Sequence, residues 1–175
     1  IAKSESKDYR GGITDFTEAI KLNQKNFYAF YNRGSAKKNL KDYEDAIKDY
    51  TEAIKLDPKD NSAYYKRAIT KNYLEDFQGA IKDFTVAINL DPKDYSAYYY
   101  RGHAKSELKD YEGAIKDYTV AINLDPKDDA AYNNRGVAKF EFKDYEGAIK
   151  DYTEAIKLDP QNYIPYKNRG EAKYE

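Results

Sequence analysis

The dipeptide Asp-Pro returns along this chain at a constant interval of 34 residues. Its four copies are Asp57-Pro58, Asp91-Pro92, Asp125-Pro126 and Asp159-Pro160. A single arginine recurs with the same period, at Arg33, Arg67, Arg101, Arg135 and Arg169. A fixed period of this length is the signature of a repeat protein, in which each unit packs against its neighbours. We therefore expect a linear array of units instead of a fold around one central core.

Within residues 61–94, the spacing of the apolar residues predicts two helices. Tyr64 and Ala68 lie on one face of the first helix. The second helix carries a continuous apolar stripe at intervals of three and four residues, formed by Ala80, Ile81, Phe84, Ala87 and Ile88. Asp76 is placed to cap this second helix, and Pro92 ends it because proline disfavours a helical conformation in the residue before it. One such hairpin cannot enclose its own apolar stripe, so neighbouring hairpins must stack.

The pattern resembles the tetratricopeptide repeat (TPR), a helix–turn–helix unit of 34 residues. The first aromatic position of that family is matched by Phe30, Tyr64, Tyr98, Tyr132 and Tyr166. The small residue four positions later is matched by Gly34, Ala68, Gly102, Gly136 and Gly170. Alanine, aromatic, alanine and proline of the second helix are matched by Ala46, Tyr50, Ala53 and Pro58, and again in the next three units. The resemblance covers the whole chain and implies an all-α fold, an α-solenoid of antiparallel helix-turn-helix repeats forming a right-handed superhelix.

The period divides residues 1–175 into a single TPR array with incomplete ends. Residues 1–26 supply only the second helix of a unit and residues 163–175 only the first. The full repeats between them are 27–60, 61–94, 95–128 and 129–162. Each end leaves an apolar stripe without a partner helix, as at Phe16. We expect either that the natural protein continues on both sides or that chains stack end to end. The chain begins with Ile1 and contains no Met, which favours a processed chain or a piece of a longer one.

The resemblance implies that the first helix of each unit lines the concave side of the array. The residues expected there are Tyr31, Asn32, Ser35, Tyr65, Lys66, Ile69, Tyr99, Tyr100, His103, Asn133, Asn134 and Val137. These positions change from unit to unit while the core positions barely change, which indicates where the sequence is free to encode a partner. Tyrosine is suited to anchoring an interface. The alternative is that these tyrosines reflect the general usage of this chain, which holds 20.

Two functions follow from this arrangement. The first is a protein-protein interaction scaffold that binds a peptide or protein segment in its concave groove. The second is a self-associating structural module that stacks end to end through its open terminal repeats. A third possibility is a regulatory segment of an enzyme whose catalytic part lies outside these residues.

One TPR ligand is not expected. Some family members bind the acidic C-terminal tails of heat-shock chaperones through a carboxylate clamp, which needs a lysine and an asparagine four residues apart on one first helix. The corresponding pairs in this chain are Tyr31/Ser35, Tyr65/Ile69, Tyr99/His103 and Asn133/Val137. None of these pairs matches, so no chaperone-tail clamp is predicted.

The repeated arginine departs from the family pattern, which has leucine at that position. Arg67 and Lys71 lie one turn apart, and aspartates such as Asp49 and Asp83 recur with the same period. Our hypothesis is that each arginine pairs with the aspartate on the second helix of the preceding unit, for example Arg67 with Asp49. The alternative is a ladder of arginine and lysine that binds anions.

Composition excludes several classes of function. Lys+Arg (30) and Asp+Glu (31) nearly cancel, so the basic excess of a nucleic-acid-binding protein is missing. No apolar run approaches the ~20 residues that span a bilayer, so no membrane partner is expected. The chain has no Cys and a single histidine, His103, which argues against a metal site or other cofactor. The carboxylates recur in every unit, whereas a general acid and base need two unlike environments at one place.

We therefore expect no catalytic residues and no enzyme activity. The sequence shows no secretory leader. That slightly favours the cytoplasm, although the compartment is not identified.

Overall fold

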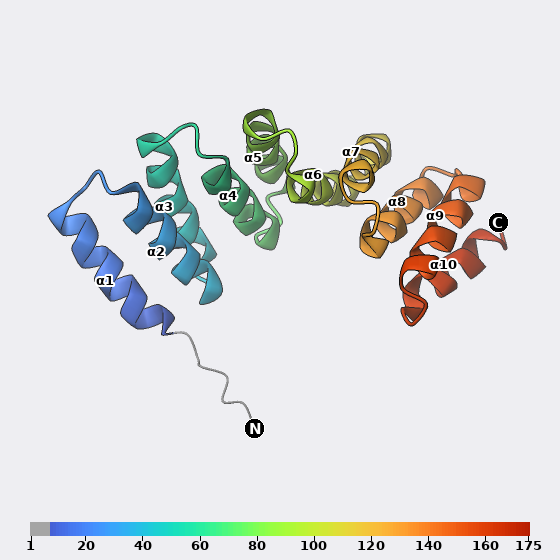
Figure 1. Cartoon of the computed structure of the whole chain (residues 1–175), viewed down its shortest axis with the longest axis horizontal. Helices are drawn as coiled ribbons and strands as arrows, with labels where there is room; N and C mark the ends of the chain where they lie inside the picture. The colour runs from blue at the N-terminus through green and yellow to red at the C-terminus, as the bar shows by residue number, and fades with distance from the viewer. Residues whose placement is uncertain (1–7) are drawn as a thin grey trace, which may run out of the picture. The chain divides into compact units, whose positions relative to one another are not determined.

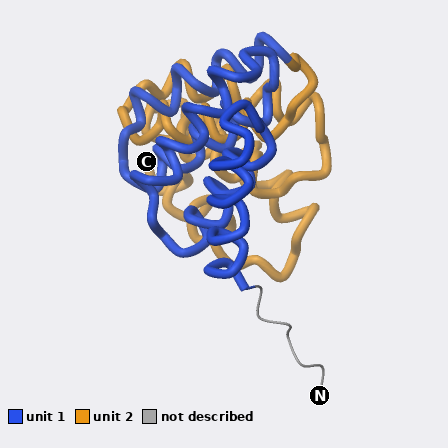
Figure 2. The backbone as a smooth tube through the Cα atoms, turned by 90° about the vertical axis from the view of Figure 1, so that its left-hand side faces the viewer, with its two compact units in different colours: residues 1–90 blue, residues 91–175 orange. Residues whose placement is uncertain are grey.

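The computed structural model describes residues 8–175 of the chain. Within that range the chain forms ten α-helices and no β-strand (Figure 1). The helices are α1 (Tyr9–Leu22), α2 (Phe27–Asn39), α3 (Tyr43–Leu56), α4 (Asn61–Tyr73), α5 (Phe77–Leu90), α6 (Tyr95–Glu107), α7 (Tyr111–Leu124), α8 (Asp129–Glu141), α9 (Tyr145–Leu158) and α10 (Tyr163–Ala172). They belong to two compact units, residues 1–90 and residues 91–175, called unit 1 and unit 2 below (Figure 2).

Each unit is built from helices that pack against the next helix along the chain. In unit 1, α2 packs on α3 and α4 packs on α5, and the contacts of α1 with α2 and of α3 with α4 join these hairpins. In unit 2, α6 packs on α7 and α8 on α9, and the hairpins are joined through α7 with α8 and α9 with α10. The predicted all-α solenoid of paired helices is confirmed at the level of these helix pairs.

Aspartates set the helix boundaries. Asp76 precedes α5, and its Oδ1 accepts a hydrogen bond from the Gly79 N–H at 2.9 Å, which confirms the cap predicted there. Between hairpins, Asp57 follows α3 and accepts a hydrogen bond from the Lys59 N–H at 3.0 Å. The helix α3 ends just before Asp57-Pro58, because proline cannot continue the helical ladder. The bond from the Lys59 N–H to Asp57 then closes the turn that follows.

The core of each hairpin is an aromatic ring of the second helix set against small residues. Tyr50, Phe84, Tyr118 and Tyr152 have at most 2% of their surface exposed. The ring of Tyr152 lies so close to α8 that a Cβ at Gly136 would come within 2.6 Å of it. The small residue of the first helix therefore allows the helices to approach closely enough to bury the ring.

A buried ion cluster joins the two helices of each hairpin. In the hairpin of α4 and α5, Arg67 Nε and Nη2 donate to the two carboxylate oxygens of Asp83 at 2.8 and 2.7 Å. Lys71 Nζ lies 2.8 Å from the same carboxylate, and only 4% of Asp83 is exposed. The equivalent clusters are Arg33–Asp49–Lys37, Arg101–Asp117–Lys105 and Arg135–Asp151–Lys139.

The predicted partner of the arginine was wrong. Arg67 was expected to pair with Asp49 of the preceding repeat, but Asp49 is held by Arg33 of its own hairpin. The arginine lies where its first helix faces its own second helix, 16 residues further along the chain. Arg67 does reach the preceding hairpin, because its Nη1 donates a hydrogen bond to the hydroxyl oxygen of Thr51 at 2.9 Å. These cations are therefore paired, which argues against the alternative of an anion-binding ladder.

The threonine contact recurs between successive helices within the units. Nη1 of the arginine donates to the threonine hydroxyl oxygen in the pairs Arg33–Thr17, Arg67–Thr51, Arg135–Thr119 and Arg169–Thr153. The threonine hydroxyl itself donates to a carbonyl one turn earlier in its helix, as Thr51 does to Ile47 O at 2.7 Å. One guanidinium thus holds its own hairpin together and fixes that hairpin against the helix before it.

We expect Phe84→Ala to lower the free energy of unfolding by roughly 3–5 kcal/mol, because it removes a fully buried ring and leaves a cavity. The control is Phe142→Ala, since 55% of Phe142 is exposed. Urea unfolding followed by circular dichroism measures both. Equal losses for the two variants would contradict this description of the core.

Candidate interaction surface

The first helices of the hairpins lie side by side within each unit. In unit 1, α2 contacts α4, whereas α3 and α5 do not contact each other. In unit 2, α6 contacts α8 and α8 contacts α10, whereas α7 and α9 do not meet. The hairpins of each unit therefore converge on the side of their first helices. All twelve residues predicted for the concave side belong to these helices.

We call the predicted residues of unit 1 the unit 1 face: Tyr31, Asn32, Ser35, Tyr65, Lys66 and Ile69. Those of unit 2 form the unit 2 face: Tyr99, Tyr100, His103, Asn133, Asn134 and Val137. Eleven of the twelve are half-buried, and Tyr100 is exposed at 37%. The side chains are therefore neither sealed in the core nor free in solvent.

The tyrosines of the unit 1 face have a second role in packing. The ring of Tyr31 stacks on Phe27 at 5.8 Å between centroids and meets Tyr50 edge-on at 5.9 Å. Tyr65 meets Phe84 in the same edge-on manner at 5.9 Å. These rings therefore contact the core aromatics while the two residues stay half-buried. Only a role in the groove was predicted for these tyrosines from the sequence, and this packing contact was not.

Positive charge gathers on the unit 1 face. Lys66 Nζ lies 5.7 Å from the centre of the Tyr65 ring, a cation–π geometry. Lys38 of α2 lies near it, a residue that was not predicted from the sequence. Burial, with the positive charge of Lys66, lowers the pKa of Lys38 from its ordinary value. Two ammonium groups at such a position disfavour each other and favour an anionic group between them.

The hydroxyl of Ser35 is committed to internal hydrogen bonds. It donates to Tyr31 O at 3.0 Å and accepts from the Tyr50 hydroxyl at 3.1 Å. Asn32 and Ser35 line a pocket of about 260 Å³ together with Tyr9 and Phe16 of α1. Ser35 therefore supports the surface more than it offers a free polar group.

The unit 2 face carries a row of side-chain amides. Asn134 Nδ2 donates to the Tyr99 hydroxyl at 2.9 Å, and Asn133 Nδ2 donates to Asn134 Oδ1 at 3.3 Å. Asn168 Nδ2 of α10 donates to Asn133 Oδ1 at 3.1 Å. The row crosses α6, α8 and α10. Asn168 was missed because the last helix was treated as an incomplete repeat, although it occupies the same repeat position as Asn134, 34 residues earlier.

His103 borders a small pocket on the unit 2 face. The pocket has a volume of about 170 Å³, and Ser106, Glu107, Asn134 and Val137 also line it. His103 Nε2 lies 3.7 Å from Glu107 Oε1, while His103 Nδ1 is buried and has no hydrogen-bond partner among the described residues. Tyr100 meets Tyr99 edge-on at 5.1 Å. Aromatic, amide and imidazole groups are thus brought together here.

In the described part of the chain, no three His, Cys, Asp or Glu residues are grouped so that they could hold a metal ion. None of the helices between residues 8 and 175 is long and apolar enough to cross a membrane.

Comparison with known families identifies the repeat. The tetratricopeptide repeat model matches residues 27–60 and 130–162, and a second TPR repeat model matches residues 102–142. Together these matches cover more than half of the chain. The chain belongs to the TPR family. A model of the protein prenyltransferase alpha subunit repeat also matches residues 77–104, and no curated protein matches the chain significantly.

This TPR chain is similar to several solved structures. YrrB, described as a TPR protein with an unusual peptide-binding site, is 18% identical, with a TM-score of 0.86 over 93% of this chain and 84% of YrrB. MamA is 23% identical, with a TM-score of 0.85 over 88% of this chain and 90% of MamA. The first TPR of Spaghetti, bound to an HSP90 peptide, is 24% identical, with a TM-score of 0.64 over 65% of this chain and 90% of its own. These similarities establish the TPR fold.

The buried tyrosines beneath the two faces should make the folded state less stable at alkaline pH. Burial raises the pKa of Tyr50 to about 12, although its hydrogen bond to Ser35 acts in the opposite direction. Burial also raises the pKa of Tyr118 and of Tyr152. Because the folded state favours the neutral phenol, stability is retained below the ordinary tyrosine pKa of about 10 and is lost as pH rises toward 12.

We expect Tyr50→Phe to make this alkaline loss less steep, because it removes one group whose titration contributes about 1.4 kcal/mol per pH unit. At neutral pH the variant loses only the hydrogen bond to Ser35, a cost of about 0.5–1.5 kcal/mol. Urea unfolding of both proteins at a series of pH values measures the two effects. The same slope in wild type and variant between pH 10 and 12 would show that Tyr50 does not titrate in this way.

Proposed function

We propose that this TPR chain is a protein-protein interaction scaffold that binds a peptide or protein segment along the unit 1 and unit 2 faces. The TPR fold is typically a scaffold for protein interaction and is typically not catalytic. The observation that carries the proposal is the row of partly exposed amides and tyrosines on the unit 2 face. The peptide-binding site of YrrB and the peptide bound by Spaghetti are precedents in proteins of the same fold.

The amide row has the hydrogen-bonding capacity that a peptide backbone needs. Asn133 and Asn134 each donate one N–H and accept one hydrogen bond inside the row. A side-chain amide has two N–H donors and two lone pairs on its oxygen. Each of these residues therefore keeps one donor and one acceptor site for a ligand. Because the row already fixes the amide orientations, less conformational entropy is lost when a peptide binds.

The unit 1 face favours an acidic side chain in the bound segment. Lys66 and Lys38 repel each other there, and a carboxylate would relieve that repulsion. The rings of Tyr31 and Tyr65 provide apolar surface beside these charges. The ligand we propose is thus an extended or helical segment with apolar residues and at least one carboxylate. The chaperone-tail clamp remains unexpected, because Tyr31 and Tyr65 stand where its lysine is required.

We also propose that the chain has no catalytic activity and no cofactor, and that it binds neither nucleic acid nor a membrane. Its near-balanced charge and its recurring, internally paired aspartates support this view. A regulatory segment of an enzyme would still act through the same binding surface.

We expect the double variant Lys66→Ala, Asn134→Ala to weaken binding of peptides selected from a random peptide library by at least tenfold. The two changes remove one charge-assisted contact and one hydrogen bond, and a loss of 1.4 kcal/mol corresponds to tenfold in Kd. Titration calorimetry measures the affinities. Both substitutions spare the edge-on rings of Tyr65 and Tyr99, so the helical content should stay unchanged in circular dichroism.

The matched control is Lys82→Ala, Lys150→Ala, which removes two exposed lysines from the second helices α5 and α9. This variant should bind the selected peptides as tightly as the wild type. A library that yields no binding peptide, or peptides that bind the two double variants equally well, would contradict the proposed surface.

A further inference from the structure

The unit 2 face contains a pocket whose wall is mostly polar. The pocket has a volume of about 170 Å³, which corresponds to roughly five water molecules at about 30 Å³ each. That is room for the end group of one side chain. Three helices, α6, α7 and α8, form the wall through His103, Ser106, Glu107, Tyr118, Asn134 and Val137. We call this site the His103 pocket.

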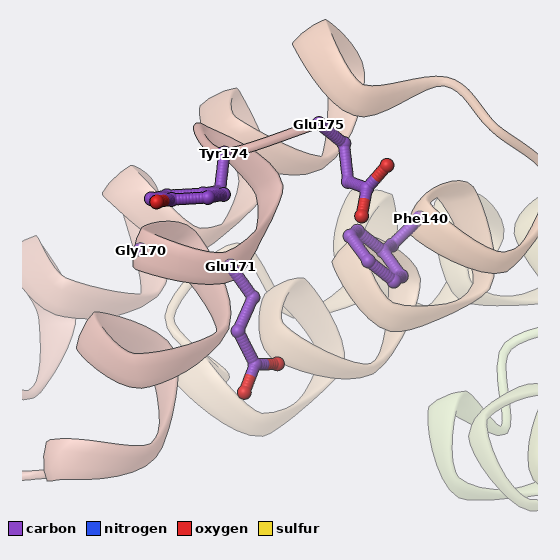
Figure 3. Close-up of a pocket in the computed structure, with 5 residues that line it drawn as sticks. All are labelled: Phe140, Gly170, Glu171, Tyr174 and Glu175. Carbon is purple, nitrogen blue, oxygen red and sulfur yellow. The ribbon is translucent and has the colours of Figure 1, made fainter.

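Internal packing sets the shape of the His103 pocket. Helix α6 packs on α7 and α7 packs on α8, all within unit 2. A larger pocket of about 500 Å³ is different, because Phe140, α10 and the last residues of the chain form its wall (Figure 3). The wall of the His103 pocket includes none of those last residues. Its chemistry therefore follows from the three helices that enclose it.

The polar groups of the His103 pocket are not paired as their counterparts in unit 1 are. In the hairpin of α2 and α3, the Tyr50 hydroxyl donates to Ser35 Oγ at 3.1 Å. Tyr118 and His103 occupy the same repeat positions two repeats later. Tyr118 is 1% exposed, yet its hydroxyl forms no hydrogen bond within residues 8–175. Buried polar groups are normally hydrogen-bonded, so this hydroxyl is available to a group that enters the pocket.

The pocket also carries unmatched negative charge. Glu107 is the carboxylate of its wall, and Oε1 lies 3.7 Å from His103 Nε2. An imidazole is mainly uncharged at neutral pH. The lysines and arginines of the three helices are all held by other carboxylates: Arg101 and Lys105 by Asp117, Lys116 by Glu112, and Arg135 and Lys139 by Asp151. None of them is therefore left to neutralise Glu107.

Acceptor atoms predominate on this wall. Burial raises the pKa of Tyr118, and Tyr99 and the carboxylate of Glu107 act in the same direction. The phenol is therefore neutral and adds no second negative charge. An ionised carboxylate such as Glu107 accepts hydrogen bonds and donates none, and a serine hydroxyl such as Ser106 accepts two and donates one. The wall thus suits a group that donates several hydrogen bonds and carries positive charge.

We propose that the His103 pocket receives a basic side chain, arginine or lysine, of the bound segment. Its charge neutralises Glu107, and its N–H groups donate to the hydroxyl oxygens of Tyr118 and Ser106. Guanidinium and ammonium groups are donors without acceptors, which matches this wall. Arginine binds more tightly than lysine, because its planar fork forms two parallel bonds with a carboxylate. This inference rests on the peptide-binding function proposed above and names a residue that the unit 2 face selects in the ligand.

The test uses the intact chain and its single histidine. Because His103 is the only histidine, the two carbon-bound protons of its ring give the only imidazole signals in a proton NMR spectrum. N-acetyl-arginine methylamide is added at one fixed pH above neutrality, and these signals should shift to saturation with a Kd on the order of millimolar. The citrulline analogue has the same shape without the charge and should bind about two- to fivefold more weakly. The lysine analogue distinguishes the two basic side chains.

Two variants assign the contacts of the probe. Glu107→Gln removes the charge with little change of shape and should weaken binding of the arginine probe by about two- to fivefold. Tyr118→Phe removes the hydroxyl and should weaken it by about two- to tenfold. The hairpin should tolerate this change, because Phe84 fills the same repeat position in α5, and circular dichroism checks the fold of both variants.

The matched control is Glu146→Gln, which removes an exposed carboxylate of α9 outside the pocket and should bind the probe like the wild type. Imidazole signals that do not respond to the arginine and lysine probes, or that respond equally to citrulline, would overturn the proposal. So would equal binding of the arginine probe by the wild type, Glu107→Gln and Tyr118→Phe.

Selected peptides separate this inference from the function on which it rests. In peptides that bind the wild type, replacing arginine and lysine by glutamine should weaken binding, and Glu107→Gln should remove most of that difference. Peptides that bind equally well without basic residues would overturn the pocket assignment and leave the scaffold proposal intact. A response of His103 to the arginine probe, with no binding peptide in the library, would support the pocket and contradict the scaffold.

Discussion

A carboxylate buried between two cations holds each hairpin of this chain together. Asp83 receives two parallel bonds from Arg67 and a third contact from Lys71. Removing charges from water costs several kcal/mol per ion, so a buried ion is tolerated only when its lone pairs are satisfied. Two parallel hydrogen bonds between the planar guanidinium and the carboxylate restrict how the two groups can be oriented. The cluster therefore fixes which helices pair and at what rotation more than it adds net stability.

That constraint also explains why the proposed binding surface is free to vary. The same guanidinium reaches Thr51 of the preceding hairpin, so one residue type sets both the hairpin and its stacking. The aromatic ring opposite the small residue, such as Tyr152 over Gly136, fills the remaining space. Neighbouring positions on the first helix, such as Lys66 and Asn134, are not needed for either contact. They are available to a ligand, and they are the positions that differ between repeats.

Much of the fold could be predicted from the sequence, because the residues that form the core and the helix caps recur at the same positions in every repeat. Phe84 in the core and Asp76 at the cap follow from spacing and residue type alone. The partner of Arg67 could not be predicted in this way. Asp49 and Asp83 share one phase of the repeat, and periodicity does not tell which of them a side chain faces. Only the placement of α4 against α5 and against α3 decides between them.

The candidate surface was predicted less completely, for related reasons. Only a role in the groove was predicted for the tyrosines of the first helices. The structure gives three of them a packing role as well, because a core ring is contacted by each of Tyr31, Tyr65 and Tyr99. Lys38 was missed because its significance depends on the nearby charge of Lys66, which is brought close by packing of α2 on α4. Asn168 was missed because the last helix was treated as an incomplete repeat, and its hydrogen bond to Asn133 of the preceding repeat could not be foreseen. Contacts between repeats leave no signal in the residues of one repeat.

The central claim is that the arginine pairs inside its own hairpin, and a pair of double-mutant cycles tests it most directly. The free energy of unfolding would be measured by urea denaturation for Arg67→Ala, Asp83→Ala and the double variant, and for the same arginine with Asp49→Ala. The account predicts a coupling energy of about 0.5–3 kcal/mol for Arg67 with Asp83, and a clearly smaller one for Arg67 with Asp49. Equal coupling in the two cycles, or a larger one with Asp49, would contradict it.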